Sequence, residues 1–205
     1  MKRTTRAFAA VSALAVVSPL GALPAFGAAD EGTEFQILNI TDFHGRIGSG
    51  VGADLAGAVT DNRQENSTFL SAGDNIGAST YASSSQQDNP TLEYLDALGL
   101  DASAVGNHEF DRGFDDIKSR DTNFEHLGAN VVKKGTDEPA FPAYTTYDVN
   151  GIKVAVIGVV TKDTKALVSP SGIKAIDFID PVKAVNKAAQ ELSLIHISEP
   201  TRRYA

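Results

Sequence analysis

The hydrophobic and polar positions of this chain alternate between short β-rich runs and stretches with helical spacing. β-Branched and aromatic runs predict strands over residues 35–40, 68–72 and 127–132. Apolar residues three or four positions apart predict helices over 54–62, from 88 to 99, from 114 to about 120, and from 180 onward. Strands that alternate with helices in this way are typical of an α/β fold with parallel strands in one sheet.

A hairpin is predicted near the second half of the chain. Residues 144–149 and 152–160 are two β-rich runs around Asn150-Gly151, a dipeptide that favours a tight type I′ turn. Its second arm is almost entirely apolar, so we expect it to be a central strand. Residues 76–87 are rich in serine, glycine and alanine and are expected to form a loop long enough to wall a site.

Two of the predicted strands run directly into residues that can bind a metal. Asp42 and His44 follow the first strand, and Asp74 follows the second. In an extended chain, side chains at positions i and i+2 point the same way. We therefore expect Asp42 and His44 to converge on one spot, while Phe43 turns back toward the core.

The stretch AVGNHEFDRG, residues 104–113, places an amide, an imidazole and two carboxylates behind a short apolar run. These side chains belong to Asn107, His108, Glu109 and Asp111. Burying all four would be costly unless each found a partner, so a metal or a substrate is the partner we infer. A polar loop at a strand end is the alternative. In an open α/β sheet, sites form outside the carboxyl ends of parallel strands, where all three polar segments would then meet.

Composition narrows the class of protein. The chain has 205 residues, 42% of them hydrophobic and 21% charged, which is enough for a globular core. The net charge of -8 disfavours nucleic acid and anionic lipid as partners. A small molecule that carries phosphate could bind only where positive charge is provided locally, which bound divalent cations would do. Cysteine is absent, so the core and any bound metal must hold the fold without disulfides.

Three segments are expected along the chain. Residues 1–29 have a basic start, a short apolar middle and a small-residue end, which is typical of a secretory signal peptide. The protein is therefore expected to be secreted or associated with the cell envelope, without stable insertion in the membrane. Residues 30–191 form the globular part. Residues 192–205 begin with LSLIHISEPTR, which resembles a translated sequencing adapter, and we expect this tail, including His196, to be non-native.

The polar segments, taken together and in order, resemble the calcineurin-like metallophosphoesterases. The resemblance rests on Asp42-x-His44, on Gly73-Asp74, and on GNHEFDxG at residues 106–113. The form NHEFD, the hairpin and the leader point to the secreted branch of 5′-nucleotidases and UDP-sugar hydrolases. The resemblance covers residues 35–190. It implies a four-layer sandwich of mixed sheets flanked by helices, of which this chain holds the N-terminal part.

The resemblance also implies a role for each polar residue. Two divalent metals would be bound by Asp42 and His44, by Asp74 as the bridge, and by Asn107. Asn107 and His108 would contact the substrate, with His108 as the catalytic histidine and Asp111 as the carboxylate that orients it. Nitrogen and oxygen ligands without thiolate admit Zn²⁺, Mn²⁺, Fe or Co²⁺, with Mg²⁺ or Ca²⁺ also possible.

Two further residues are given no catalytic role, and several functions stay open. Glu109 is expected to point aside and pair with a cation, and His126 to be a surface histidine or a satisfied core histidine. The implied activity is a 5′-nucleotidase, with UDP-sugar hydrolase or cyclic-nucleotide phosphodiesterase as alternatives. Later histidine segments of the family are not in this sequence. A non-catalytic, metal-binding half-domain is therefore the alternative of another class, and this chain by itself is expected to be inactive.

Overall fold

The computed structural model describes residues 34–48, 50–149 and 151–194. The expected leader at 1–29 and residues 195–205 of the expected tail lie outside these described residues. The main sheet has four strands in the order β1-β2-β3-β4, all parallel. The strands are β1 (Gln36–Ile40), β2 (Ser67–Ser71), β3 (Ala102–Ala104) and β4 (Glu125–Leu127). The predicted parallel α/β arrangement is thereby confirmed.

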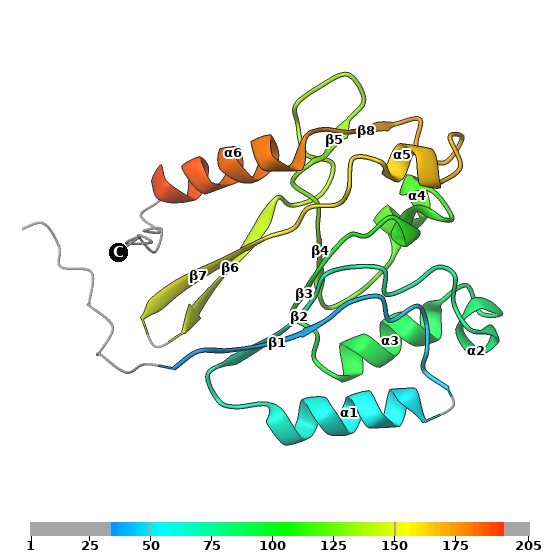
Figure 1. Ribbon diagram of the computed structural model, residues 1–205, viewed down its shortest axis with the longest axis vertical. Coiled ribbons are helices and arrows are strands. Elements are labelled where there is room, and N and C mark those ends of the chain that lie inside the picture. Colours follow the sequence, from blue (N-terminus) through cyan, green and yellow to red (C-terminus); the bar gives the residue numbers. More distant parts are fainter. Residues whose placement is uncertain (1–33, 49, 150, 195–205) are drawn as a thin grey trace, which may run out of the picture.

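The helices that connect these strands agree with the helical spacing of the sequence. They are α1 (Val51–Asn62), α2 (Tyr81–Ser84), α3 (Asn89–Ala97), the 3₁₀ turn η1 (His108–Phe110) and α4 (Phe114–Ser119). Pro90 lies in the first turn of α3, where its missing N–H costs nothing. The short helix α2 interrupts the segment that we expected to be a loop throughout. Figure 1 shows α1 and α3 along one side of the parallel sheet.

The two faces of β2 contact two different apolar clusters, because successive side chains of a strand point to opposite faces. Phe69 is fully buried in the larger cluster, together with Leu95 of α3 and Phe110. Leu70 belongs to a smaller cluster with Ala102 and Leu127. The larger cluster holds the helices and the loop after β3 in place. The smaller one joins the sheet to the hairpin on its other face.

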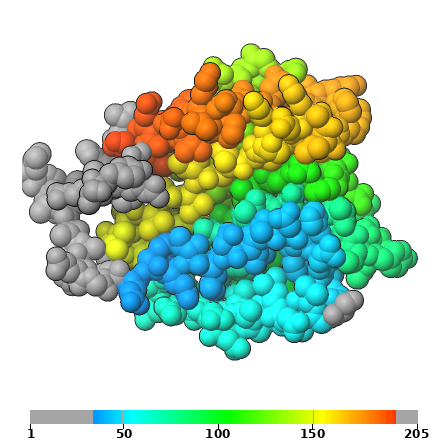
Figure 2. Space-filling view, in the orientation of Figure 1, coloured from blue at the N-terminus to red at the C-terminus, as the bar shows by residue number. Residues whose placement is uncertain are grey.

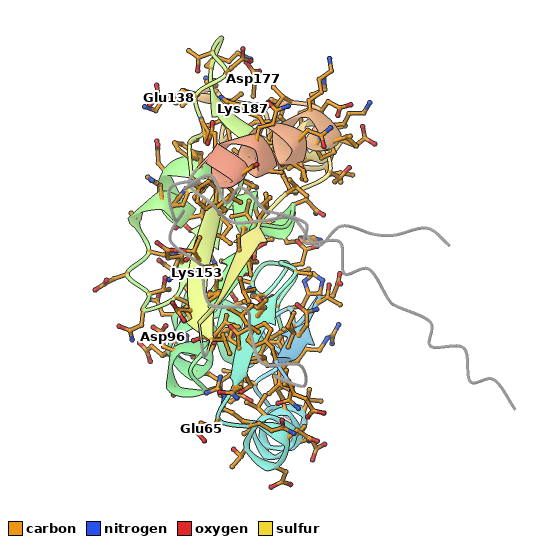
Figure 3. The ribbon with its side chains drawn as sticks, turned by 90° about the vertical axis from the view of Figure 1, so that its left-hand side faces the viewer. Glu65, Asp96, Glu138, Lys153, Asp177 and Lys187 are labelled. Atoms are coloured by element: carbon orange, nitrogen blue, oxygen red, sulfur yellow. The ribbon has the colours of Figure 1, made fainter. Side chains whose placement is uncertain are left out.

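Two antiparallel pairs complete the described part of the chain. One pair joins β5 (Val131–Lys133) to β8 (Ile176–Phe178), and the other is the hairpin of β6 (Tyr144–Val149) and β7 (Ile152–Ile157). The last helices are α5 (Thr164–Leu167) and α6 (Pro181–Leu194). Figure 1 shows α1 and α6 at opposite ends of the molecule. Figure 3 places Glu138, Asp177 and Lys187 near the end that holds β5, β8 and α6.

The hairpin forms where the sequence predicts it, but the expectation that its second arm is a central strand is wrong. Within the described residues, β7 pairs only with β6, and the side chains of β7 are exposed or half-buried. The arm is apolar because one side of it packs on the small cluster through Val156. Figure 2 shows the hairpin reaching the surface, beside β1.

The strand expected over 127–132 is in fact two strands in different sheets. β4 ends at Leu127, and β5 begins at Val131. Between them the chain turns, and the buried side chain of Asn130 donates to the carbonyl of Val160 at 2.7 Å and accepts from its N–H at 2.9 Å. Residues 127–132 are all buried, so hydrophobicity alone does not reveal the turn. Among the described residues, the helices are all too short or too polar to cross a membrane.

Candidate functional site

The loops that follow β1, β2 and β3 meet at the carboxyl edge of the parallel sheet. We call these loops, residues 41–45, 72–77 and 105–111, the ligand edge. Backbone pairing continues past the strand ends, since the N–H of Asp42 donates to the carbonyl of Gly73 at 3.1 Å. The N–H of His44 likewise donates to the carbonyl of Asp74 at 3.0 Å. The position of the first loop is thus set by the second.

Asp42 and His44 converge as expected, but the expectation that the chain is extended there is wrong. Asp42 has φ 54° and His44 has φ 49°, so the loop is left-handed at both residues and is not extended. The closest approach is between Nε2 of His44 and Oδ1 of Asp42, 3.8 Å apart. Phe43 between them is buried, and its ring stacks on that of Tyr94 at 5.7 Å, as expected for a residue that turns to the core.

Three side chains at this edge offer ligand atoms to a single metal ion. One ligand atom each from Asp42, His44 and Asp74 lie within 4.8 Å of one another. Nδ1 of His44 lies 2.9 Å from the carbonyl oxygen of Gly77, so this nitrogen carries the proton and donates it. Nε2 is then left with a free lone pair on the side facing Asp42. The donor set therefore fits a divalent cation.

His108 and Asp111 form a hydrogen-bonded pair beside these ligands. Nδ1 of His108 lies 2.9 Å from Oδ2 of Asp111, because the 3₁₀ turn η1 brings positions i and i+3 onto the same side. Partial burial lowers the pKa of His108, but the hydrogen bond and charge of Asp111 outweigh it, so the pKa is raised overall. The ring of His108 stands edge-on to that of His44 at 4.9 Å. The pair and the metal-competent cluster therefore lie side by side.

Asp74 connects the second and third loops of the ligand edge. Its Oδ1 accepts from the backbone N–H of His108 at 2.8 Å. Gly106 permits this approach, since a Cβ there would lie 2.2 Å from Oδ1 of Asp74. Asn107 lies between Gly106 and His108 and is half-buried. The structure thus brings five of the six expected residues together through measured contacts, and the sixth, Asn107, by its place in the chain.

Glu109 does not point aside toward a cation, so that expectation is wrong. It is 1% exposed, and its carboxylate accepts three backbone N–H groups. Oε2 accepts from Gly106 at 2.6 Å and from Asp74 at 2.9 Å, and Oε1 accepts from Asn75 at 2.8 Å. Burial raises the pKa of Glu109 to about 7, although these hydrogen bonds act to lower it. Its placement directly after His108 in a motif dense with polar residues was the available signal of a structural role.

A second buried network supports the loop after β2. Asn75 is 1% exposed, its carbonyl oxygen accepts from the hydroxyl of Ser71 at 2.6 Å, and its amide donates to Ser103 at 2.8 Å. These residues did not stand out in the sequence, because serine and asparagine are common in exposed turns. The network fixes the loop from the side of the sheet.

His126 is neither a surface histidine nor a satisfied core histidine. It lies in β4, and its Nε2 is buried without a hydrogen-bond partner among the described residues. Burial lowers the pKa of His126 to about 4. It takes no part in the ligand edge.

A cavity of about 280 Å³ adjoins His108 and Asp111. It is lined by His108, Asp111 and Arg112 on one side and by Gly77 and Ser79 on the other. The segment 76–87, expected to wall a site, does so through these residues. The cavity gives the ligand edge space for a small polar molecule.

Comparison with known proteins identifies relatives with the same fold and related sequences. No family model matches the chain. Endonuclease YhcR of Bacillus subtilis is 38% identical over 80% of this chain, and a 5′-nucleotidase of Vibrio vulnificus is 36% identical over 80% of it. The matches cover 16% and 32% of those relatives, so the chain spans a third of their length or less.

The crystal structure of the calcineurin-like phosphoesterase YfkN from Bacillus subtilis has the same fold. It superposes with a TM-score of 0.66 at 22% identity, covering 78% of this chain and 58% of that one. The parallel sheet and its flanking helices are thus shared with that structure. The chain is thus related in sequence to 5′-nucleotidases over 80% of its length, and it has the fold of a calcineurin-like phosphoesterase.

Proposed function

We propose that this protein is a metal-dependent phosphoester hydrolase whose substrates are nucleoside monophosphates. The observation that carries the proposal is the closeness of two groups. Ligand atoms of Asp42, His44 and Asp74 lie within 4.8 Å of one another, and the ring of His108 lies 4.9 Å from that of His44. A metal-competent cluster beside a histidine with a carboxylate partner is the arrangement that hydrolysis of a phosphoester needs.

Four residues would hold two divalent cations, with Zn²⁺, Mn²⁺, Fe or Co²⁺ favoured by the nitrogen and oxygen donors. Asp42 and His44 would bind the first, Asp74 would bridge, and Asn107 would bind the second. When bound, such cations neutralise charge on phosphoryl oxygens and make a nucleophile available from water at neutral pH.

The other steps belong to residues of the chain. Asp111 holds Nδ1 of His108 at 2.9 Å and so sets which ring nitrogen is free to meet the substrate phosphate. With Nδ1 held by Asp111, His108 is placed to stabilise negative charge or to donate a proton to the departing oxygen. The backbone N–H of His108 is already occupied by Asp74, so that peptide is fixed before substrate binds.

Location and substrate are part of the same proposal. The leader-like residues 1–29 support export to the cell exterior or envelope. The relationship to a 5′-nucleotidase supports nucleoside monophosphates as substrates. The relationship to a protein named an endonuclease supports phosphodiesters of nucleic acid as the second candidate substrate, against the expectation from the acidic net charge.

The test is hydrolysis by the purified full-length protein, with the nucleotide and sugar-phosphate products separated by chromatography and free phosphate measured for AMP. AMP, UDP-glucose, cyclic AMP and a single-stranded oligonucleotide are offered separately, before and after EDTA, and after addition of Mn²⁺. We expect AMP to be hydrolysed, EDTA to abolish the activity, and Mn²⁺ to restore it. Preference for the oligonucleotide would favour the second candidate. Binding of Mn²⁺ without turnover of any substrate would favour a non-catalytic metal-binding protein and overturn the proposal.

A further inference from the structure

Glu109 is a buried carboxylate that takes no direct part in the proposed reaction. It is 1% exposed and lies one residue after His108, yet it points away from that side chain and into the molecule. The described residues place no cationic side chain within ion-pair distance of it. Its three partners are backbone N–H groups, and they come from two of the three loops of the ligand edge.

The contacts between these two loops are reciprocal. The carboxylate of Glu109, from the loop after β3, accepts the N–H of Asp74 at 2.9 Å. The carboxylate of Asp74, from the loop after β2, accepts the N–H of His108 at 2.8 Å. Each loop thus supplies an acceptor side chain to the backbone of the other. The hydrogen bond from Asn75 to Oε1 of Glu109, 2.8 Å long, adds a third connection in the same place.

We propose that Glu109 is a positioning residue that holds Asp74 where it can bridge two cations. Asp74 has φ 55°, and Gly73 before it has φ 102°, so two successive residues are left-handed. An aspartate in that conformation is strained, and the strain persists only where the surroundings impose the conformation. The hydrogen bonds from Asp74 and Asn75 to Glu109 impose it here. The inference rests on the proposed metal-dependent function of the same edge.

The chemistry of the contact requires a carboxylate of this length. Three N–H donors converge on two oxygens, and an ionised carboxylate is a group with acceptors only. Glutamine has the same shape but offers one acceptor oxygen and an NH₂ group, which would face an N–H. Aspartate is shorter by one methylene and could not reach both loops. We therefore expect Glu109→Gln to loosen the loop of Asp74 without creating a cavity.

A matched control exists in the turn between β4 and β5. Asn130 is fully buried and also makes three side-chain hydrogen bonds to the backbone, two to Val160 and one to Ile179. It connects β5 to segments outside the ligand edge. Asn130→Asp is isosteric, as Glu109→Gln is, and it turns an amide donor into an oxygen that faces two carbonyls. This variant therefore measures how the loss of a buried set of side-chain hydrogen bonds affects the protein when none of those bonds holds a proposed metal ligand.

The experiment measures Mn²⁺ binding and backbone exchange in the full-length protein. Mn²⁺ affinity is determined by calorimetry and by the loss of the free-ion electron paramagnetic resonance signal. Hydrogen exchange of residues 72–76 and 104–108 is measured without metal. We expect Glu109→Gln to weaken Mn²⁺ binding by about 10- to 100-fold, in line with other partners that orient metal ligands, and to speed exchange in both segments. Asn130→Asp should lower the melting temperature but leave Mn²⁺ affinity and exchange in these segments unchanged.

Three results would overturn the inference. One is wild-type Mn²⁺ affinity in folded Glu109→Gln, and another is an equal loss of affinity in Asn130→Asp. The third needs no variant. In the metal-free wild type, the amides of Asp74, Asn75 and Gly106 should exchange slowly, and fast exchange would contradict their hydrogen bonds to Glu109. A wild-type protein that binds no Mn²⁺ but shows slow exchange at these amides would overturn the proposed function. The hydrogen bonds to Glu109 would then have a structural role only.

Discussion

The ligand edge and the β6–β7 hairpin are built in opposite ways. At the ligand edge, buried polar side chains such as Glu109 and Asn75 fix the backbone, and a Cβ at Gly106 would collide with Asp74. At the hairpin, strands pair only with each other among the described residues, and a Cβ at Gly151 would meet nothing within 4 Å. Precise placement of the backbone is thus concentrated at the ligand edge. The hairpin should affect stability alone.

The largest expected effect is the loss of activity in His108→Ala. Removing a general acid or charge-stabilising group typically lowers the rate by about 10²- to 10⁴-fold. The melting temperature should change little, because the side chain of His108 is partly exposed and its partner Asp111 stays solvated. Phosphate release from AMP and a thermal melt of the same preparation measure the two quantities. Wild-type activity in His108→Ala would contradict the proposed role of the ligand edge in hydrolysis.

The next largest effect is on stability and comes from the hairpin side of the sheet. Leu127 is fully buried in the cluster that packs against Tyr147 and Val156 of the hairpin. Leu127→Ala should cost about 2–5 kcal/mol of unfolding free energy, measured by urea denaturation. Below the transition, kcat should stay that of the wild type. Val182→Ala, at a side chain 66% exposed, is the control and should change stability by less than about 0.5 kcal/mol.

A third prediction separates His126 from the histidines of the ligand edge. His44 and His108 have a partner at Nδ1, whereas burial without a partner lowers the pKa of His126 to about 4. Between that pKa and the unfolded value near 6.5, the unfolded chain binds the extra proton, so stability falls as the pH is lowered through this range. The full loss is about 3 kcal/mol.

The measurement is urea denaturation of wild type and His126→Phe at several pH values from 7 to 4. The phenylalanine variant cannot take up the proton, so its stability should depend less on pH. Parallel curves for the two proteins would contradict the low pKa. Other groups titrate in both proteins alike and cancel in the difference.

The smallest expected effect is at the turn of the hairpin. Gly151 has φ 83°, so an alanine there is strained, but no neighbouring atom is displaced. Gly151→Ala should therefore cost about 1 kcal/mol and leave activity and Mn²⁺ affinity intact. Thermal melts and calorimetry measure both. A loss of Mn²⁺ binding in this variant would show that the hairpin and the ligand edge are coupled, which would break the contrast between them.

The sequence predicts β1, β2, the hairpin, most helices and the closeness of the polar segments, because these depend on periodicity and on strand ends. Parallel pairing brings the loops after β1, β2 and β3 to one edge whatever their local backbone. The roles of Asp42, His44, Asp74, Asn107, His108 and Asp111 remain predictions.

What the sequence does not reveal depends on long-range contacts of individual residues. Glu109 has the same side chain as any exposed glutamate, and only the meeting of two loops gives it three N–H partners. The turn between Leu127 and Val131 lies in a continuous buried run that joins two different sheets, so it has no exposed residues to mark it. The second arm of the hairpin is apolar, and one of its faces packs against the smaller cluster. Periodicity alone cannot distinguish such a strand from a central one.

The order of strands in the main sheet follows the order of the sequence, β1-β2-β3-β4. Each loop of the ligand edge therefore lies beside the loop that precedes it along the chain, and residues 42–111 supply all of them. During synthesis, this whole segment is made before β6 and β7. Contacts of short sequence separation also form fastest. The ligand edge can thus assemble first, and the later segments fold onto a site that already exists.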